Sequence, residues 1–200
     1  MVKKRVKITF TDDLLGTCSG NPELHREFIA SKAPDAKKMK EEVEALGVDA
    51  VEEKEMTVFP KMADGTPFLY DYQIRGFFKE ICGAMRAISG TKSSKVKAYK
   101  KKIDNTVFVE PREILLDLHG LMMGSCQRPL RASTPLGERI ALANSEVCPE
   151  GTTCEFDVIC MVDDDADMLV EWLDYGEYKG MGQWRNSGKG RFTYEISDIS

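Results

Sequence analysis

Apolar and polar residues alternate strictly in three parts of the chain, and this alternation predicts β-strands. In residues 2–10, VKKRVKITF, one face of the strand carries mostly apolar side chains and the other carries Lys3, Arg5 and Lys7. CEFDVICMV at 154–162 and FTYEI at 192–196 repeat the pattern, and the leucines and isoleucine of 114–118 suggest a further strand. The first of these strands therefore has one basic face.

Apolar residues recur at helical spacing in three other segments. The clearest is Tyr72 to Ser89, with an unbroken apolar stripe, Asp71 as candidate N-cap and Gly90 as the stop. A second helix follows the aspartates at 163–165 and ends near Gly176, and a short charged helix is predicted within 34–46. The main elements run strand, helix, strand, strand, helix, strand, which predicts an α+β, ferredoxin-like plan with insertions.

Neither tandem repeats nor a low-complexity linker divides the chain, so we expect one domain over residues 1–200. Two segments interrupt the pattern: a charged insertion at about 31–57 and a Lys-rich segment at about 91–102. The Lys-rich segment contains no acidic residue within TKSSKVKAYKKK, and the simplest expectation for it is a solvated loop.

The overall charge is acidic but unevenly distributed. With 28 Lys and Arg against 33 Asp and Glu, the net charge is -5, which argues against a protein that coats nucleic acid by bulk charge. Acidic residues concentrate at 35–55 and 155–177, whereas basic residues group at 3–7 and 92–102. Any nucleic-acid contact must therefore come from a local patch.

The sequence gives little support to a metal site, a cofactor or a membrane span. The 6 cysteines include no CxxC pair, and His25 and His119 are far from any such pair, so we expect buried free thiols and no metal or cofactor. Neither a secretory leader nor an apolar run long enough to cross a bilayer is visible, which predicts a cytoplasmic protein without a membrane partner.

Residues 178–195, YKGMGQWRNSGKGRFTYE, combine glycines, cations and an aromatic ring. The glycines permit a tight loop with backbone N–H groups facing an anion, the cations contact phosphates, and the tryptophan offers a stacking face for a base. These candidates are Gly180, Gly182, Trp184, Arg185, Asn186, Lys189, Gly190 and Arg191. The stretch does not fit GxxxxGK[ST], the pattern of the nucleotide-binding P-loop. The alternative is a structural connection into an edge strand, with Trp184 covering the core.

Two motifs in this order resemble the RAMP superfamily, the RNA-binding subunits of CRISPR effector complexes. GMGQWRNSGKGRF at 180–192 resembles its C-terminal glycine-rich motif, and DGTPFLYDYQIRGFFKEICGAMR at 64–86 resembles the entry to its first helix. Arg75 takes the position of the family's lysine, and Gly76 that of the glycine after it. At 70–73 the chain departs from the family pattern, with Tyr-Asp-Tyr-Gln in place of Pro-Gly-Ser-Ser.

The resemblance implies a modified RNA-recognition fold that holds RNA by its backbone. The first hypothesis is a groove for single-stranded RNA lined by the strand face, the long helix, the Lys-rich segment and the glycine stretch. Outside the glycine stretch, the predicted contacts are Lys3, Arg5, Lys7, Arg75, Lys79 and Lys100. The expected partners are RNA and either CRISPR effector subunits or further copies of this chain in a filament.

Two other functions remain open at this point. The acidic segments favour a protein-binding mimic of such a subunit, encoded by a phage or plasmid and acting as an anti-CRISPR inhibitor. A nuclease would depend on Asp12 and Asp13 or on the aspartates at 163–165, and the latter are better explained as the start of a helix. We therefore carry over no catalytic residue from the family.

Overall fold

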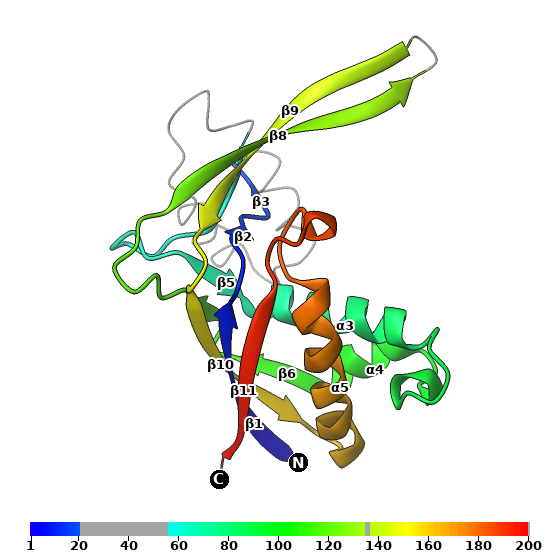
Figure 1. Cartoon of the computed structure of the whole chain (residues 1–200). Helices are drawn as coiled ribbons and strands as arrows, with labels where there is room; N and C mark the ends of the chain where they lie inside the picture. The colour runs from blue at the N-terminus through cyan, green and yellow to red at the C-terminus, as the bar shows by residue number, and fades with distance from the viewer. Residues whose placement is uncertain (21–55, 135–136, 200) are drawn as a thin grey trace, which may run out of the picture.

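The computed structural model of the 200-residue chain describes residues 1–20, 56–134 and 137–199. The predicted helix within 34–46, nearly all of the charged insertion and His25 lie outside the described residues. Within them, three α-helices lie beside several β-sheets, in keeping with the predicted α+β class (Figure 1). No helix of this part has the length and apolar character that a membrane span requires.

Four strands form the central sheet, and every neighbouring pair is antiparallel. In sheet order they are β11 (Phe192–Ile199), β1 (Val2–Phe10), β10 (Thr153–Cys160) and β6 (Val107–Glu110). Helix α3 (Asp71–Met85) lies between β1 and β6 in the chain, and α5 (Asp163–Lys179) joins β10 to β11. Each of these connections skips one strand of the sheet.

Helices α3 and α5 cover one face of this sheet, and the core lies between the two layers (Figure 1). Val6 and Ile8 from β1 are fully buried in the same cluster as Phe78 from α3 and Trp172 from α5. The two aromatic rings are 5.6 Å apart between centroids. Burying each large apolar side chain stabilises the fold by about 1.5–3 kcal/mol, so the alternation of β1 and the helical stripes decide this layer.

A long hairpin extends beyond the rest of the described structure, at the top of Figure 1. It consists of β8 (Gly124–Thr134) and β9 (Gly137–Cys148), and β9 also pairs with two short strands near its base. The shorter elements are β2 (Leu14–Leu15), β3 (Cys18–Ser19), β4 (Met56–Val58), β5 (Phe68–Tyr70), β7 (Glu113–Leu115), α4 (Tyr99–Thr106) and the single turns η2 (Ser93–Lys95) and η3 (Arg185–Ser187). The sequence patterns did not predict the hairpin or α4.

The ends of both long helices differ from the prediction. Tyr70, not Asp71, is the N-cap of α3, because the Gln73 side chain accepts a hydrogen bond from the Tyr70 backbone N–H (2.7 Å). The helix ends at Met85, before the predicted Ser89. Helix α5 does not end near Gly176 but continues to Lys179. A Cβ at Gly176 would lie 2.6 Å from the Phe77 ring, so this glycine lets α5 lie against α3 instead of ending the helix.

The Lys-rich segment is only in part the predicted solvated loop. Its exposed side chains include Lys92, Lys95, Lys97, Lys100 and Lys101, but its backbone is anchored to the helix layer. The segment contains η2 and the first turn of α4, and Ser93 is fully buried, where its hydroxyl accepts a hydrogen bond from the Trp172 indole (3.0 Å). Lys102 lies 2.8 Å from the Asp165 carboxylate in α5. The segment is ordered because it packs against α5, a contact that local composition could not indicate.

Candidate nucleic-acid interface

The glycine-rich segment at 180–191 closes on itself immediately after α5. Gly180 and Gly190 both have positive φ, and the Met181 N–H donates to the Gly190 carbonyl (2.9 Å). A Cβ at Gly190 would lie 1.9 Å from the Met181 carbonyl oxygen, and one at Gly180 would lie 2.7 Å from the Lys189 carbonyl oxygen. These two glycines therefore bring the two ends of the loop together, where no other residue fits.

Two of the predicted cations in this loop pair with acids from other segments. Arg185 donates to the Glu80 carboxylate of α3 (2.7 Å), and Lys189 donates to the Asp13 carboxylate (2.6 Å). The bond to Asp13 raises the pKa of the Lys189 amine. Arg191, Asn186 and Ser187 have no side-chain partner among the described residues, so they are the loop's free polar groups.

Trp184 neither fills the core nor lies fully open. It has positive φ, its side chain is 37% exposed, and the Arg128 guanidinium lies over its ring at 5.3 Å from the centroid. Arg128 comes from β8, is only 6% exposed and donates to the Gln183 side chain (2.5 Å). The loop is thus attached to the base of the hairpin, and one face of the indole is taken by Arg128.

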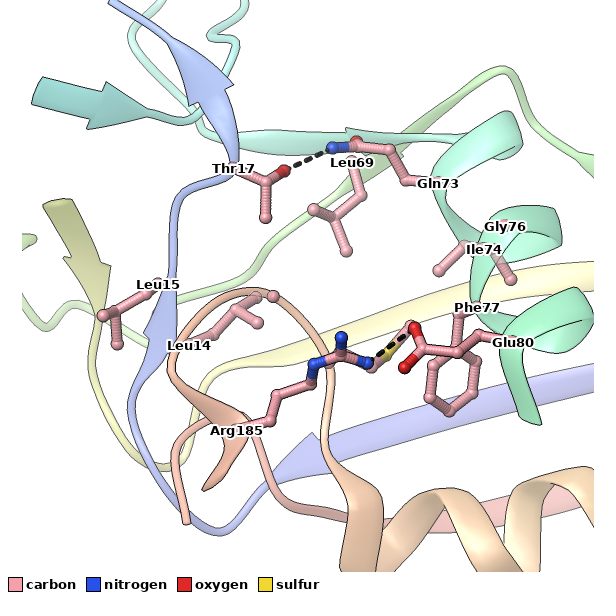
Figure 2. A pocket seen from close by; sticks show the side chains of 12 residues that line it. Leu14, Leu15, Thr17, Leu69, Gln73, Ile74, Gly76, Phe77, Glu80 and Arg185 are labelled. Carbon is pink, nitrogen blue, oxygen red and sulfur yellow. Dashed lines mark hydrogen bonds and ion pairs between the residues drawn. The ribbon is translucent and has the colours of Figure 1, made fainter. Parts of the chain in front are cut away.

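A cavity of about 250 Å³ opens between this loop, β2 and the first turns of α3 (Figure 2). Its walls are mostly apolar and include Leu14, Leu69, Phe77 and Met181. Polar side chains stand in two pairs at the cavity: Gln73 donates to the Thr17 hydroxyl (2.8 Å), and Arg185 pairs with Glu80, as the dashed lines of Figure 2 show. The structure thereby brings together the two motifs that the sequence analysis singled out.

The helix cations predicted to contact nucleic acid are compensated within the protein. Arg75 donates to Asp71 one turn earlier (2.9 Å), and Lys79 forms an ion pair with Asp104 of α4. At the start of the helix, the Gln73 amide oxygen already accepts from the Tyr70 N–H. A phosphate at this helix start would have to displace that side chain.

Lys3, Arg5 and Lys7 lie on the face of the sheet that the helices leave open. Arg5 donates to Asp157 on β10 (2.8 Å), Lys3 is 3.1 Å from the same carboxylate, and Arg5 holds the pKa of Asp157 below its usual value. Lys7 makes no side-chain ion pair or hydrogen bond within the described residues, yet the strand register sets it between Glu155 and Glu195. The basic face of β1 is therefore matched by acids of the neighbouring strands.

Lys100 is exposed on α4 and has no side-chain partner within the described ranges. It lies in the helix layer, on the opposite side of the sheet from Lys3, Arg5 and Lys7 (Figure 1). The predicted contacts accordingly fall on separate surfaces: the loop with the start of α3, the open sheet face, and the α4 region. They do not line one continuous groove.

Sequence reasoning missed three contributors to the site: the β2 segment, Glu80 and Arg128. Their signals were weak because Glu80 is one polar residue on a helix face and Arg128 lies in a segment without a predicted element. All 6 cysteines are free; Cys18, Cys82, Cys148, Cys154 and Cys160 are buried and Cys126 is half-buried, which confirms the prediction of free, mostly buried thiols. Burial raises the pKa of Cys154 to about 12, so this thiol stays protonated at neutral pH.

Comparison with known proteins found no matching family model and no match among curated proteins. Solved structures do match. One chain of a type III-B Cmr-beta complex, determined by cryo-EM bound to cognate target RNA, superposes with a TM-score of 0.59 at 11% identity. The match covers 100% of this chain and 61% of that one, so this chain spans about three fifths of that subunit's length.

A chain of a type IV-B CRISPR complex superposes with a TM-score of 0.51 at 12% identity, covering 98% of this chain and 90% of that one. At such low identity the likeness concerns the fold. This protein therefore has the fold of subunits found in CRISPR complexes.

Proposed function

We propose that this protein is a RAMP-type subunit that holds single-stranded RNA at the glycine-rich loop. The observation that carries the proposal is the cavity in Figure 2, where the loop meets the start of α3 in a fold similar to subunits of CRISPR complexes, one of them solved bound to target RNA. The strand order β11-β1-β10-β6, with both crossovers skipping one strand, supports a ferredoxin-like, modified RNA-recognition fold over one domain.

The predicted contacts contribute unequally to the proposed RNA site. Arg191 and Asn186 are unpartnered among the described residues, Lys189 would exchange its carboxylate partner for phosphate, and Arg185 lies with Glu80 at the cavity. Gly180, Gly182 and Gly190 shape the loop through their positive φ angles. Arg128 covers one face of the Trp184 ring, and the opposite face is the one proposed to stack on a base. We propose a secondary role for Arg75, Lys79, Lys100 and the cations of β1, because most of them are paired or distant.

The first experiment is a salt titration of RNA binding. Fluorescently labelled single-stranded RNA and DNA of the same sequence are titrated with protein at about 50 mM and about 200 mM salt. A protein that contacts several phosphates should lose orders of magnitude in affinity over this range. Salt-dependent binding that prefers RNA supports the proposal, and no binding at low salt contradicts it.

A second candidate is a protein-binding mimic of such a subunit that does not hold RNA. One surface favours it: Leu115 and Leu121, 50% and 53% exposed, line the same shallow hollow, and Met122 next to Leu121 is 88% exposed. Contiguous exposed apolar groups mark sites of contact with another protein, whereas contacts to an RNA backbone require cations. If RNA binding fails, inhibition of a reconstituted CRISPR effector by the purified protein would support this role, as would its incorporation into one.

A further inference from the structure

The cavity beside the glycine-rich loop has the size and walls of a site for a small planar group. Its volume of about 250 Å³ is below the roughly 300 Å³ at which pockets for drug-sized ligands begin. Leu14, Leu69 and Met181 give it apolar walls, and Phe77 adds an aromatic ring. Such walls disfavour a charged phosphate and favour an uncharged ring.

The charged groups of the cavity also favour an uncharged planar ligand. Arg185 and Glu80 are its only charged lining residues among those described, and they pair at 2.7 Å, while Lys179 outside the lining lies 3.9 Å from the same carboxylate. Side by side, a guanidinium and a carboxylate offer a donor and an acceptor to one edge of a planar ligand. A carboxylate accepts from a base amino group and a guanidinium donates to a base carbonyl or ring nitrogen, so the pair complements a nucleobase edge.

Gly76 in α3 is a second, independent indication that the cavity admits a ligand. It is an exposed residue within α3 and lines the cavity, and a Cβ built on it meets no atom within 4 Å. Gly83 in the same helix differs, because its Cβ would lie 2.7 Å from the Tyr99 hydroxyl. Packing thus explains Gly83 but not Gly76, although glycine disfavours a helix interior. Its missing side chain leaves the cavity open toward solvent.

We infer that this cavity is a nucleobase subsite: one base of the bound strand turns out of the stack and enters between α3, β2 and the loop, while the phosphates stay outside on Arg191 and Lys189. The inference rests on the proposed function and specifies which part of the strand occupies the site. It makes Gly76 a residue that admits the base, since Gly76 lines the cavity and the space next to it is open.

The test compares Gly76→Leu with wild type on two short ligands of equal length: a single-stranded oligoribonucleotide, and the same sugar-phosphate chain without bases. Loss of one held base should weaken binding of the oligoribonucleotide by roughly tenfold, with little change for the abasic chain and an unchanged salt slope. Equal loss on both ligands, with a salt slope smaller by about one, would assign the cavity to a phosphate and overturn the inference.

Two controls separate this outcome from other failures. Gly76→Ala should melt at or above the wild-type temperature, because alanine favours the helix and meets no atom, and it should already weaken binding of the oligoribonucleotide. Ala84→Leu places the same bulk on α3 away from the cavity and should leave binding unchanged. If wild type binds RNA and Gly76→Leu binds it equally well, only the subsite is excluded. If wild type binds no RNA, the proposed function itself fails.

Discussion

The open face of the central sheet and the glycine-rich loop both carry clustered cations, but their surroundings differ. On the open face, Lys3, Arg5 and Lys7 lie among four carboxylates: Glu110, Glu155, Asp157 and Glu195. At the loop, two cations have one carboxylate partner each, and Arg191 has none among the described residues. Neighbours distant in sequence decide whether a basic stripe is available to a polyanion.

The largest effect should come from breaking the loop itself. Gly190→Ala sets a Cβ 1.9 Å from the Met181 carbonyl oxygen at a φ of +71°, so overpacking and backbone strain should together lower the free energy of unfolding by about 4 kcal/mol. Urea denaturation measures this. Gly188→Ala is the matched control: its φ is +86° but its nearest neighbour is 3.9 Å away, and we expect a loss of only about 1 kcal/mol. Equal effects would show that close approach is not what the loop requires.

A pair of triple variants compares the two cationic regions directly. Changing Arg185, Lys189 and Arg191 to Ala should reduce RNA affinity strongly and lower the salt slope by about two, one for each of the phosphate contacts of Lys189 and Arg191. Changing Lys3, Arg5 and Lys7 to Ala should reduce it less than threefold at about 150 mM salt, because acids already neutralise these cations. A larger loss from the strand variant would reverse our assignment of the two surfaces.

Removing acids from the open face should sharpen the comparison. Glu155 and Glu195 lie opposite Lys7 on the two neighbouring strands. Glu155→Gln combined with Glu195→Gln leaves the face basic, and we expect RNA affinity to rise by roughly threefold at low salt and to return to wild type at about 0.5 M salt. Fluorescence anisotropy detects this change. An unaltered affinity at low salt would mean that the strand never approaches this face.

The smallest effect concerns stability in acid. The Arg5 hydrogen bond lowers the pKa of Asp157, so this carboxylate stabilises the fold fully above about pH 4 and loses its contribution as the pH falls through its lower folded-state pKa. Asp157→Asn should reduce the melting temperature by no more than about 4 °C at pH 7. The difference between variant and wild type should shrink below about pH 4. A difference that grows in acid would contradict this pairing.

The sequence predicted those parts of the site that depend on residue type. The positive φ of Gly180 and Gly190 and the turn they form follow from glycine chemistry, and the buried stripe of α3 follows from apolar spacing. The cavity was not predictable, because Leu14 and Glu80 carry no local sign that they line one cavity with Arg185. Likewise, the pairing of Lys102 with Asp165 depends on α4 lying against α5.

The sequence by itself determined the α+β class, the first strand with its one basic face, the two long helices and the loop that only glycine could form. Each of these depends on local geometry or on the burial of periodic apolar residues. Tertiary structure alone decided which cations remain free, which face of Trp184 is covered and where a cavity opens. Charge compensation and empty volume are properties of segments brought together by packing, and no local pattern encodes them.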